Sequence, residues 1–189
     1  MRLSFGMYSI ELVTHTCRRE LDSALQKIGA RQEVIDVANG EGNAFYVLKF
    51  KPEIIESPES GSRFIGLCSS RTGIEPQILL NTSTKQLYLG LDSSLLIFTI
   101  PSGPTRCLNL DGPFYSMTLF QALERILVVH EIGLLWLDTS GDIVWHHDAS
   151  DVISAVIRPA PDTLELRLFE GGRTALDLTT GRVLKKTPK

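Results

Sequence analysis

A recurring strand and turn pattern in the second half of the chain constrains the fold more than any other feature. From residue 86 onward, short apolar runs are separated by Gly, Asp, Ser and Thr. Three units emerge, and the turn before the last strand of each ends in Gly103, Gly141 or Gly181, at intervals of 38 and 40 residues. One more apolar run precedes each unit. The pattern therefore predicts repeats of four strands, a spacing typical of propeller blades.

The strands of these units are apolar on both faces. Runs such as ILVV (126–129) and LLWL (134–137) do not alternate between apolar and polar residues. An antiparallel strand with one face in water alternates cleanly. The Gly residues in the EIG, EGG and TSG turns suit hairpins that need a positive φ. We therefore expect sheets that are covered on both faces, as blades packed face to face are.

The predicted fold class is mainly β, with antiparallel four-stranded meander repeats and one N-terminal helix. Two arrangements of the meanders fit the pattern, a small or incomplete propeller-like array and a curved sheet or sandwich. Closed propellers have four to eight blades, and only three units are visible in the sequence. An open array exposes strand edges, and exposed edges favour pairing with another chain.

The N-terminal helix is predicted over residues 17–28. Its apolar side chains Leu21, Leu25 and Ile28 follow the spacing of one helical face. Thr16 stands where a helix cap is expected.

A polar loop at 51–62, with two prolines and a glycine, is the best candidate for a segment boundary. We expect residues 1–62 to form an α+β segment that packs on the β array or completes it. Residues 63–189 are then a β-meander repeat domain. The stretch 43–70 supplies at most a degenerate fourth unit.

The third unit matches four positions of a known blade signature, Ala-x-Asp-x-x-Thr-Gly-x-x-x-Trp. The matching residues are Ala175, Asp177, Thr180 and Gly181. On these residues the region 86–186 resembles the quinoprotein-type (PQQ-like) β-propeller repeat. Lys185 stands where the signature has its tryptophan.

The second unit carries the other half of the same signature. Gly141 is followed four residues later by Trp145, and Ser140 replaces the threonine. Leu135 and Leu137 stand at the Ala and Asp positions. The resemblance implies that these residues dock one blade on the next, and it does not imply a bound quinone.

Two groups of side chains have both a packing and a binding interpretation. Trp136 and Trp145 suit packing within or between blades, and a ligand cage is the alternative. Among the three cysteines, Cys17 is followed by two basic residues, Arg18 and Arg19, which favour a reactive thiolate. Buried or half-buried thiols in a reducing compartment are the simpler interpretation.

Polar side chains with metal-binding chemistry gather at two strand ends of the second unit. The first and third strands of a meander end at the same edge, roughly 10 Å apart. Imidazoles and a carboxylate that meet there offer metal ligands or an acid–base pair. The candidate metal ligands are His130, Glu131, His146, His147 and Asp148.

Two other interpretations of these residues remain open. Strand ends carry polar residues because they meet solvent, and the same side chains also suit a patch that binds a partner. His146 and His147 are adjacent, so a continuing strand directs them to opposite faces. They share one ion only if the strand has already ended.

Composition and motifs exclude several classes of function. The formal net charge is −3, and neither half of the chain has the basic excess that nucleic-acid binding requires. The sequence has no GxGxxG loop, no Walker lysine and no GxSxG elbow. We therefore predict no catalytic residue and no cofactor, and we leave enzymatic activity undecided but disfavoured.

The function predicted from these features is a non-catalytic protein–protein interaction module, of the kind found in immunity proteins or antitoxins. The expected partner is another protein or a second copy of the chain, bound through exposed strand edges. The alternative is a metal-binding protein or hydrolase-type enzyme that uses the His130, His146 and His147 cluster. No apolar run approaches the length of a membrane span, so we expect a cytoplasmic protein without membrane contact.

Overall fold

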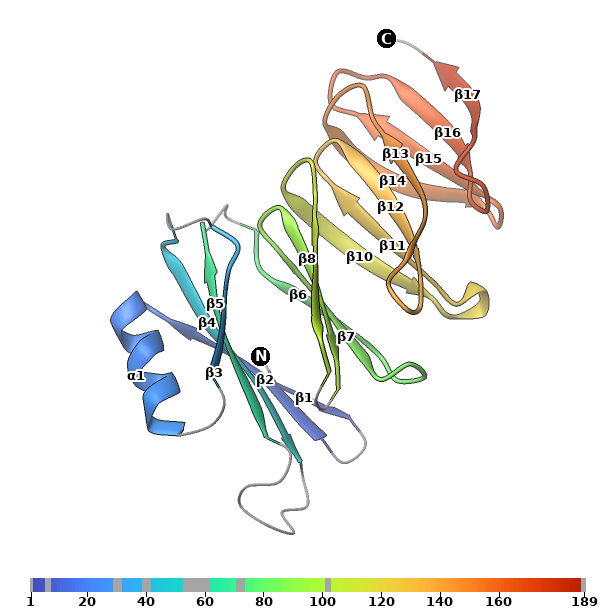
Figure 1. Ribbon diagram of the computed structural model, residues 1–189. Coiled ribbons are helices and arrows are strands. Elements are labelled where there is room, and N and C mark those ends of the chain that lie inside the picture. Colours follow the sequence, from blue (N-terminus) through green and yellow to red (C-terminus); the bar gives the residue numbers. More distant parts are fainter. Residues whose placement is uncertain are drawn as a thin grey trace. The chain divides into compact units, whose positions relative to one another are not determined.

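The chain folds mainly into antiparallel β-strands, as the repeat pattern predicted (Figure 1). The computed structural model divides it into two compact units, Met1–Leu108 and Asn109–Lys189. It describes residues 2–5, 8–28, 32–38, 42–52, 62–70, 74–100 and 103–187. Three four-stranded sheets in this part of the chain have consecutive strand order, and we call them the first, second and third meander sheets.

Unit 1 contains a five-stranded sheet, one helix and the first meander sheet. The five-stranded sheet has the order β1-β2-β4-β5-β3, and its strand β3 runs parallel to β5. The elements are β1 (Arg2–Phe5), β2 (Tyr8–His15), α1 (Arg18–Ile28), β3 (Gln32–Asp36), β4 (Ala44–Pro52), β5 (Arg63–Ser69), β6 (Gln77–Asn81), β7 (Gln86–Leu91), β8 (Ser94–Thr99) and β9 (Thr105–Asn109).

The helix α1 forms where the sequence predicted it and covers one face of the five-stranded sheet. Its side chains Leu21 and Leu25 are fully buried against Phe45, Val47 and Phe64. The opposite face of the same sheet packs against the leucine-rich strands β7 and β8 of the first meander sheet. Unit 1 is therefore built as three layers, helix, sheet and sheet (Figure 1).

The start of α1 is held by a side-chain contact that involves the predicted cap. The Thr16 backbone N–H and hydroxyl both donate to the Glu20 carboxylate, at 2.9 and 2.8 Å. The acidic side chain in the first turn also suits the positive end of the helix dipole.

The described residues 44–52 and 62–69 do not form a fourth meander. They supply β4 and β5, which pair with each other and with β2 and β3 in the five-stranded sheet. Strands from both sides of residue 62 thus share one sheet. Most of the predicted boundary loop, residues 53–61, lies outside the described residues, and the segment boundary there stays a prediction.

Unit 2 consists of the second and third meander sheets packed face to face (Figure 1). Their elements are β10 (Phe114–Phe120), a short 3₁₀ helix η1 (Gln121–Leu123), β11 (Arg125–His130), β12 (Gly133–Asp138), β13 (Ile143–Asp148), β14 (Ile153–Ala160), β15 (Thr163–Leu168), β16 (Arg173–Asp177) and β17 (Val183–Thr187). The core between them is made by Leu127, Val129, Leu134, Trp136 and Trp145 from one sheet and by Ile153, Leu164, Leu166, Leu168, Leu176 and Leu178 from the other.

The two tryptophans are packing residues, as the sequence favoured. Their rings stack at 5.7 Å with an interplanar angle of 14°. The Trp145 indole N–H donates to the Leu178 carbonyl at 3.1 Å. Gly181 has φ +69°, and a Cβ added there would lie 2.6 Å from the Trp145 ring. A tryptophan of one sheet therefore docks on the glycine turn of the next, which is the blade-on-blade role that the resemblance implied.

The alignment of the second unit with the blade signature needs one correction. Asp177 in the third sheet accepts hydrogen bonds from the backbone and hydroxyl of Thr180. In the second sheet Asp138, and not Leu137, makes the matching bonds, to the backbone and hydroxyl of Ser140. The turn there is one residue shorter, so a fixed spacing counted back from Gly141 placed Leu137 at the wrong position.

Candidate functional site

Strand pairing aligns two of the predicted ligands, His130 and Asp148, across the second meander sheet. His130 at the end of β11 pairs with Gly133, which pairs in turn with Asp148 at the end of β13. A Cβ added at Gly133 would lie 2.5 Å from the His130 Nε2. The imidazole therefore lies over the glycine, in the space that any other residue at 133 would fill.

His130 is a buried histidine with an unsatisfied ring nitrogen. Its side chain is 2% exposed, and its Nδ1 has no hydrogen-bond partner. Burial lowers the pKa of the imidazole below its usual value, against the opposing charges of Asp111 and Asp148. The neutral form is favoured, because it needs only one acceptor for its single N–H.

His146 and His147 are kept apart. The strand β13 continues through both residues to Asp148, so the two imidazoles lie on opposite faces of the sheet. Burial lowers the pKa of His147, the charges of Lys186 and His146 lower it further, and Asp148 raises it. His146 itself is exposed.

Glu131 belongs to the two-residue turn after β11 and is held through its backbone. Its N–H donates to the Pro113 carbonyl at 2.9 Å, and its carbonyl accepts from the Ile153 N–H at 2.8 Å. Within the described residues, no group of three or more His, Cys, Asp or Glu side chains is arranged to hold a metal ion. The metal site therefore stays a prediction from sequence.

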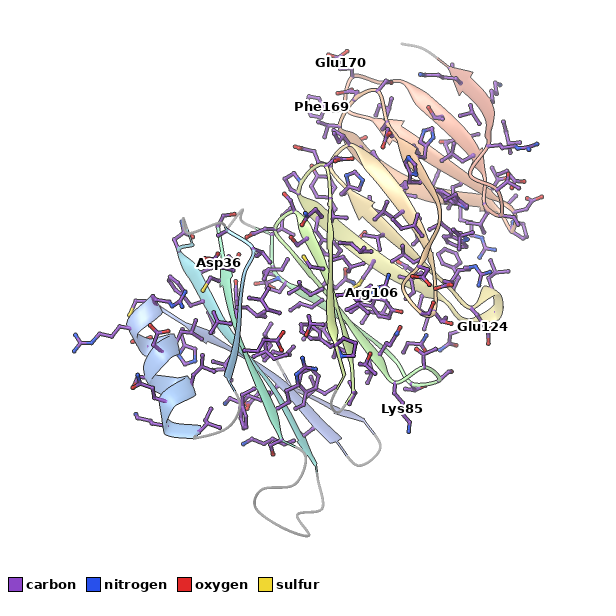
Figure 2. All side chains as sticks on the ribbon, viewed as in Figure 1. Asp36, Lys85, Arg106, Glu124, Phe169 and Glu170 are labelled. Carbon is purple, nitrogen blue, oxygen red and sulfur yellow. The ribbon has the colours of Figure 1, made fainter. Side chains whose placement is uncertain are left out.

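The structure adds a site that the sequence analysis took only for a turn. The hairpin between β15 and β16 exposes Phe169 at 78% and places Glu170 beside it. Figure 2 labels both side chains, at the end of the third meander sheet. The signal was present in the sequence: Leu164, Leu166 and Leu168 alternate toward the core, so the next apolar residue faces away from it.

The third meander sheet also has an exposed outer face and an exposed edge. All five residues of β17 are exposed, including Val183 at 51% and Leu184 at 58%. On the outer face, the Arg167 Nε lies 3.3 Å and the Arg173 Nη1 3.9 Å from the Glu165 carboxylate. These are surface ion pairs, and their contribution to stability is small.

Arg18 follows Cys17 in the sequence and contacts Cys68 in the structure. Cys17 is exposed, and the guanidinium of Arg18 donates instead to the Cys68 sulfur at 2.9 Å. Burial raises the pKa of the Cys68 thiol, and the Arg18 charge partly opposes this shift. The thiol form is favoured, which argues against a reactive thiolate at this position.

Comparison with known proteins gives matches among solved structures only. No model of a protein family matches the chain, and no curated protein matches it. The WD40 domain of Neurospora crassa Pan2 matches 63% of this chain with 40% of its own length, at 12% identity and a TM-score of 0.48. The C-terminal WD40 domain of Sif2 matches 84% of this chain with 48% of its own length, at 12% identity and a TM-score of 0.47.

The chain thus spans less than half the length of the two solved structures. Its own topology carries the fold assignment: each meander sheet has the four antiparallel strands in consecutive order that a propeller blade has. No helix in the described part of the chain has the length and apolarity needed to cross a membrane.

Proposed function

We propose that this chain is a non-catalytic module that binds another protein through the third meander sheet. The observation that carries the proposal is the exposure of β17 along its whole length, on a sheet whose outer face is also exposed. A strand edge of this kind presents backbone N–H and C=O groups to a partner. The apolar side chains of Val183 and Leu184 add contact area.

The charge of this edge favours a different protein over a second copy of the chain. The segment from Arg173 to Thr187 carries four basic residues and one carboxylate, although the whole chain has a net charge of −3. Lys185 and Lys186 lie in the middle of β17. If two copies paired through this strand, their lysines would lie close together, and like charges on paired strands are destabilising.

Charge reversal on the edge strand tests the proposal. The chain is purified with a partner from its source cells, and binding is then measured between the two purified proteins. We expect the double variant Lys185→Glu and Lys186→Glu to weaken binding by about tenfold or more. The matched control reverses Arg19 and Lys27 on the exposed side of α1 and leaves binding unchanged. Equal affinity for both double variants would overturn the proposal.

The finer form of the proposal is an immunity-type or antitoxin-type protein of the cytoplasm that occludes a partner enzyme. The repeat region is then of the quinoprotein type, used purely as a scaffold, and the docking of Trp145 on Gly181 supports this use. If the isolated partner is an enzyme, we expect the chain to inhibit it and the edge-strand variant to restore its activity.

A second candidate function is a metal-binding or hydrolase-type role for His130. The observation that favours it is the buried Nδ1, which has no hydrogen-bond partner. Metal analysis of the purified chain decides this. Stoichiometric zinc or iron that is lost in the variant His130→Gln would support the second candidate, and a metal-free chain after exposure to both ions would exclude it.

A further inference from the structure

Phe169 is the most exposed of the large hydrophobic side chains that the structure describes. It is 78% exposed, and the next most exposed, Leu184, is at 58%. A single exposed apolar residue is common on protein surfaces. Phe169 differs because the backbone that presents it is fixed.

Hydrogen bonds hold the hairpin tip from two sides. The Phe169 N–H donates to the Val152 carbonyl at 2.8 Å, and the Glu170 N–H donates to the Asp151 carboxylate at 2.8 Å. Across the turn, the Leu168 N–H donates to the Gly172 carbonyl at 2.9 Å. The other oxygen of Asp151 accepts from the Val152 N–H at 2.7 Å, so this carboxylate is itself oriented.

The corresponding turns of the other meander sheets present no such residue. The turn between β11 and β12 has two residues, Glu131 and Ile132, and both are partly buried. The turn between β15 and β16 has four residues, from Phe169 to Gly172. The longer turn moves the aromatic ring beyond the ends of the strands, where it has no burial to gain within its own sheet.

A rigid turn with an exposed aromatic ring has the properties of a binding anchor. Aromatic side chains dominate the energetics of protein interfaces when they enter a pocket on the partner. A turn that is already ordered loses little conformational entropy on binding. Phe169 meets both conditions, because its ring is exposed and its backbone is bonded on both sides.

We infer that Phe169 is the anchor that enters an apolar pocket on the partner protein, with Glu170 facing a basic group at the rim of that pocket. This inference rests on the proposed function and names the contact through which it acts. The charge of the tip favours a protein pocket over a membrane, because Glu170 and Asp151 bring two carboxylates to the hairpin tip and anionic lipid surfaces repel carboxylates.

Site-specific photo-crosslinking tests where the partner binds. The photoreactive residue p-benzoylphenylalanine replaces Phe169, Leu184 or Leu123 in three separate variants expressed in the source cells. Leu123 is the matched control, an apolar residue of η1 that is 44% exposed. We expect one protein to be crosslinked from position 169 and none from position 123.

Affinity measurements with the purified crosslinked protein test the anchor itself. We expect Phe169→Ala to weaken binding by about 30-fold or more, as loss of an interface anchor does. Leu123→Ala should leave binding unchanged. Glu170→Lys should weaken binding, and the loss should shrink at high salt. Both Phe169→Ala and the control should unfold at the wild-type urea midpoint, since neither residue is buried.

A variant that loosens the hairpin tip but keeps the Phe169 ring tests whether the ordered backbone contributes to affinity. Asp151→Ala removes the acceptor for the Glu170 N–H, and the Phe169 side chain itself is not replaced. We expect an affinity loss of about three- to tenfold, between the wild type and Phe169→Ala.

The outcomes separate the inference from the proposed function. A crosslink from position 184 and none from 169 would leave the interaction module standing and overturn the anchor. Crosslinks from neither position would overturn both. A crosslink between two copies of the chain, or binding of the wild type but not Phe169→Ala to phosphatidylcholine vesicles, would also overturn the inference of a partner protein.

Discussion

The second and third meander sheets share a strand order but differ in how completely their central strands are buried. In the second sheet, β11 and β12 are buried at nearly every position. In the third, β15 and β16 alternate between buried and exposed residues. The strand β11 reads RILVVH, and its counterpart β15 reads TLELRL. Polar residues thus replace apolar ones at alternate positions, on the face that no neighbouring sheet of unit 2 covers.

This difference in burial identifies the parts of such a repeat array that are available for binding. A sheet with two covered faces contributes to the core, and only its strand ends and outer edge meet solvent. The third sheet offers an outer face, the strand β17 and the hairpin tip at Phe169. The charges on that face keep it soluble, and they also leave it free to contact a partner.

Exchanging the residue types at one matched position should give the largest effect. Leu127 and Glu165 are the third residues of β11 and β15. Leu127 lies in the core between the second and third sheets, and Glu165 lies on the outer face of the third sheet. We expect Leu127→Glu to lower the free energy of unfolding by about 4 kcal/mol or more, because it buries an unpaired carboxylate. Glu165→Leu should change it by less than about 0.5 kcal/mol. Urea denaturation measures both, and equal losses would show that the two faces are equivalent.

A smaller loss in the free energy of unfolding is expected at Gly181, where the second and third meander sheets meet. Gly181→Ala places a Cβ against the Trp145 ring at a residue with φ +69°. We expect a loss of about 2 kcal/mol from backbone strain and displacement of the indole. Thr179→Ala, on an exposed residue of the same turn, is the control. A wild-type urea midpoint for Gly181→Ala would contradict the docking role of Trp145.

Loss of the aspartate in the turn of the second sheet should have a lesser effect. The Asp138 carboxylate accepts hydrogen bonds from the N–H groups of Ser140 and Asp142 and from the Ser140 hydroxyl. We expect Asp138→Ala to cost about 1 kcal/mol, since these bonds are near the surface. Ser150→Ala is a matched surface control, and thermal unfolding of the two variants checks the difference.

The smallest predicted effect is on the pH dependence of stability between pH 8 and pH 5, to which His130 and His147 contribute through their lowered pKa values. Burial lowers the folded-state pKa of His130 below the ordinary value of 6.5. The unfolded chain therefore takes up a proton first, and stability is lost as the pH falls through about 6.5 toward the folded pKa. We expect His130→Gln to reduce this loss between pH 8 and pH 5. The half-buried His147, whose pKa is also lowered by burial, accounts for a remaining part. An unchanged profile for His130→Gln would contradict the assignment.

The repeats were predictable because their signals are local. Apolar runs separated by glycine turns fix the strands of a meander, and consecutive strands pair with their neighbours. The helix α1 was predictable for the same reason, since Leu21, Leu25 and Ile28 follow the spacing of one helical face and all three pack in the same cluster. The blade signature implied that Trp145 and Gly181 have docking roles, but it did not predict that these two residues contact each other.

Other features of the fold and of the candidate site could not be predicted from the spacing of residues in the sequence. The parallel pairing of β3 with β5 joins strands that are far apart in the sequence, and no local pattern specifies it. The turn at Asp138 is shorter by one residue, which shifted the alignment of Leu137. The candidate ligands lay at the same strand ends, but the continuation of β13 separated His146 from His147. The fixed backbone at Phe169 depends on the hydrogen bond from the next residue, Glu170, to Asp151, which lies 19 residues earlier in the sequence.

Native-state thiol labelling tests the central comparison most directly. Val129 and Arg167 occupy the matched fifth positions of β11 and β15, one buried and one exposed. Each is replaced by cysteine in a chain whose exposed Cys17 and Cys107 are changed to serine. We expect the thiol at 167 to react within about tenfold of the rate of an unfolded peptide. The thiol at 129 should react at least about a thousandfold more slowly than that peptide. Similar rates at the two positions would contradict the claim that β11 is buried on the face where β15 is exposed.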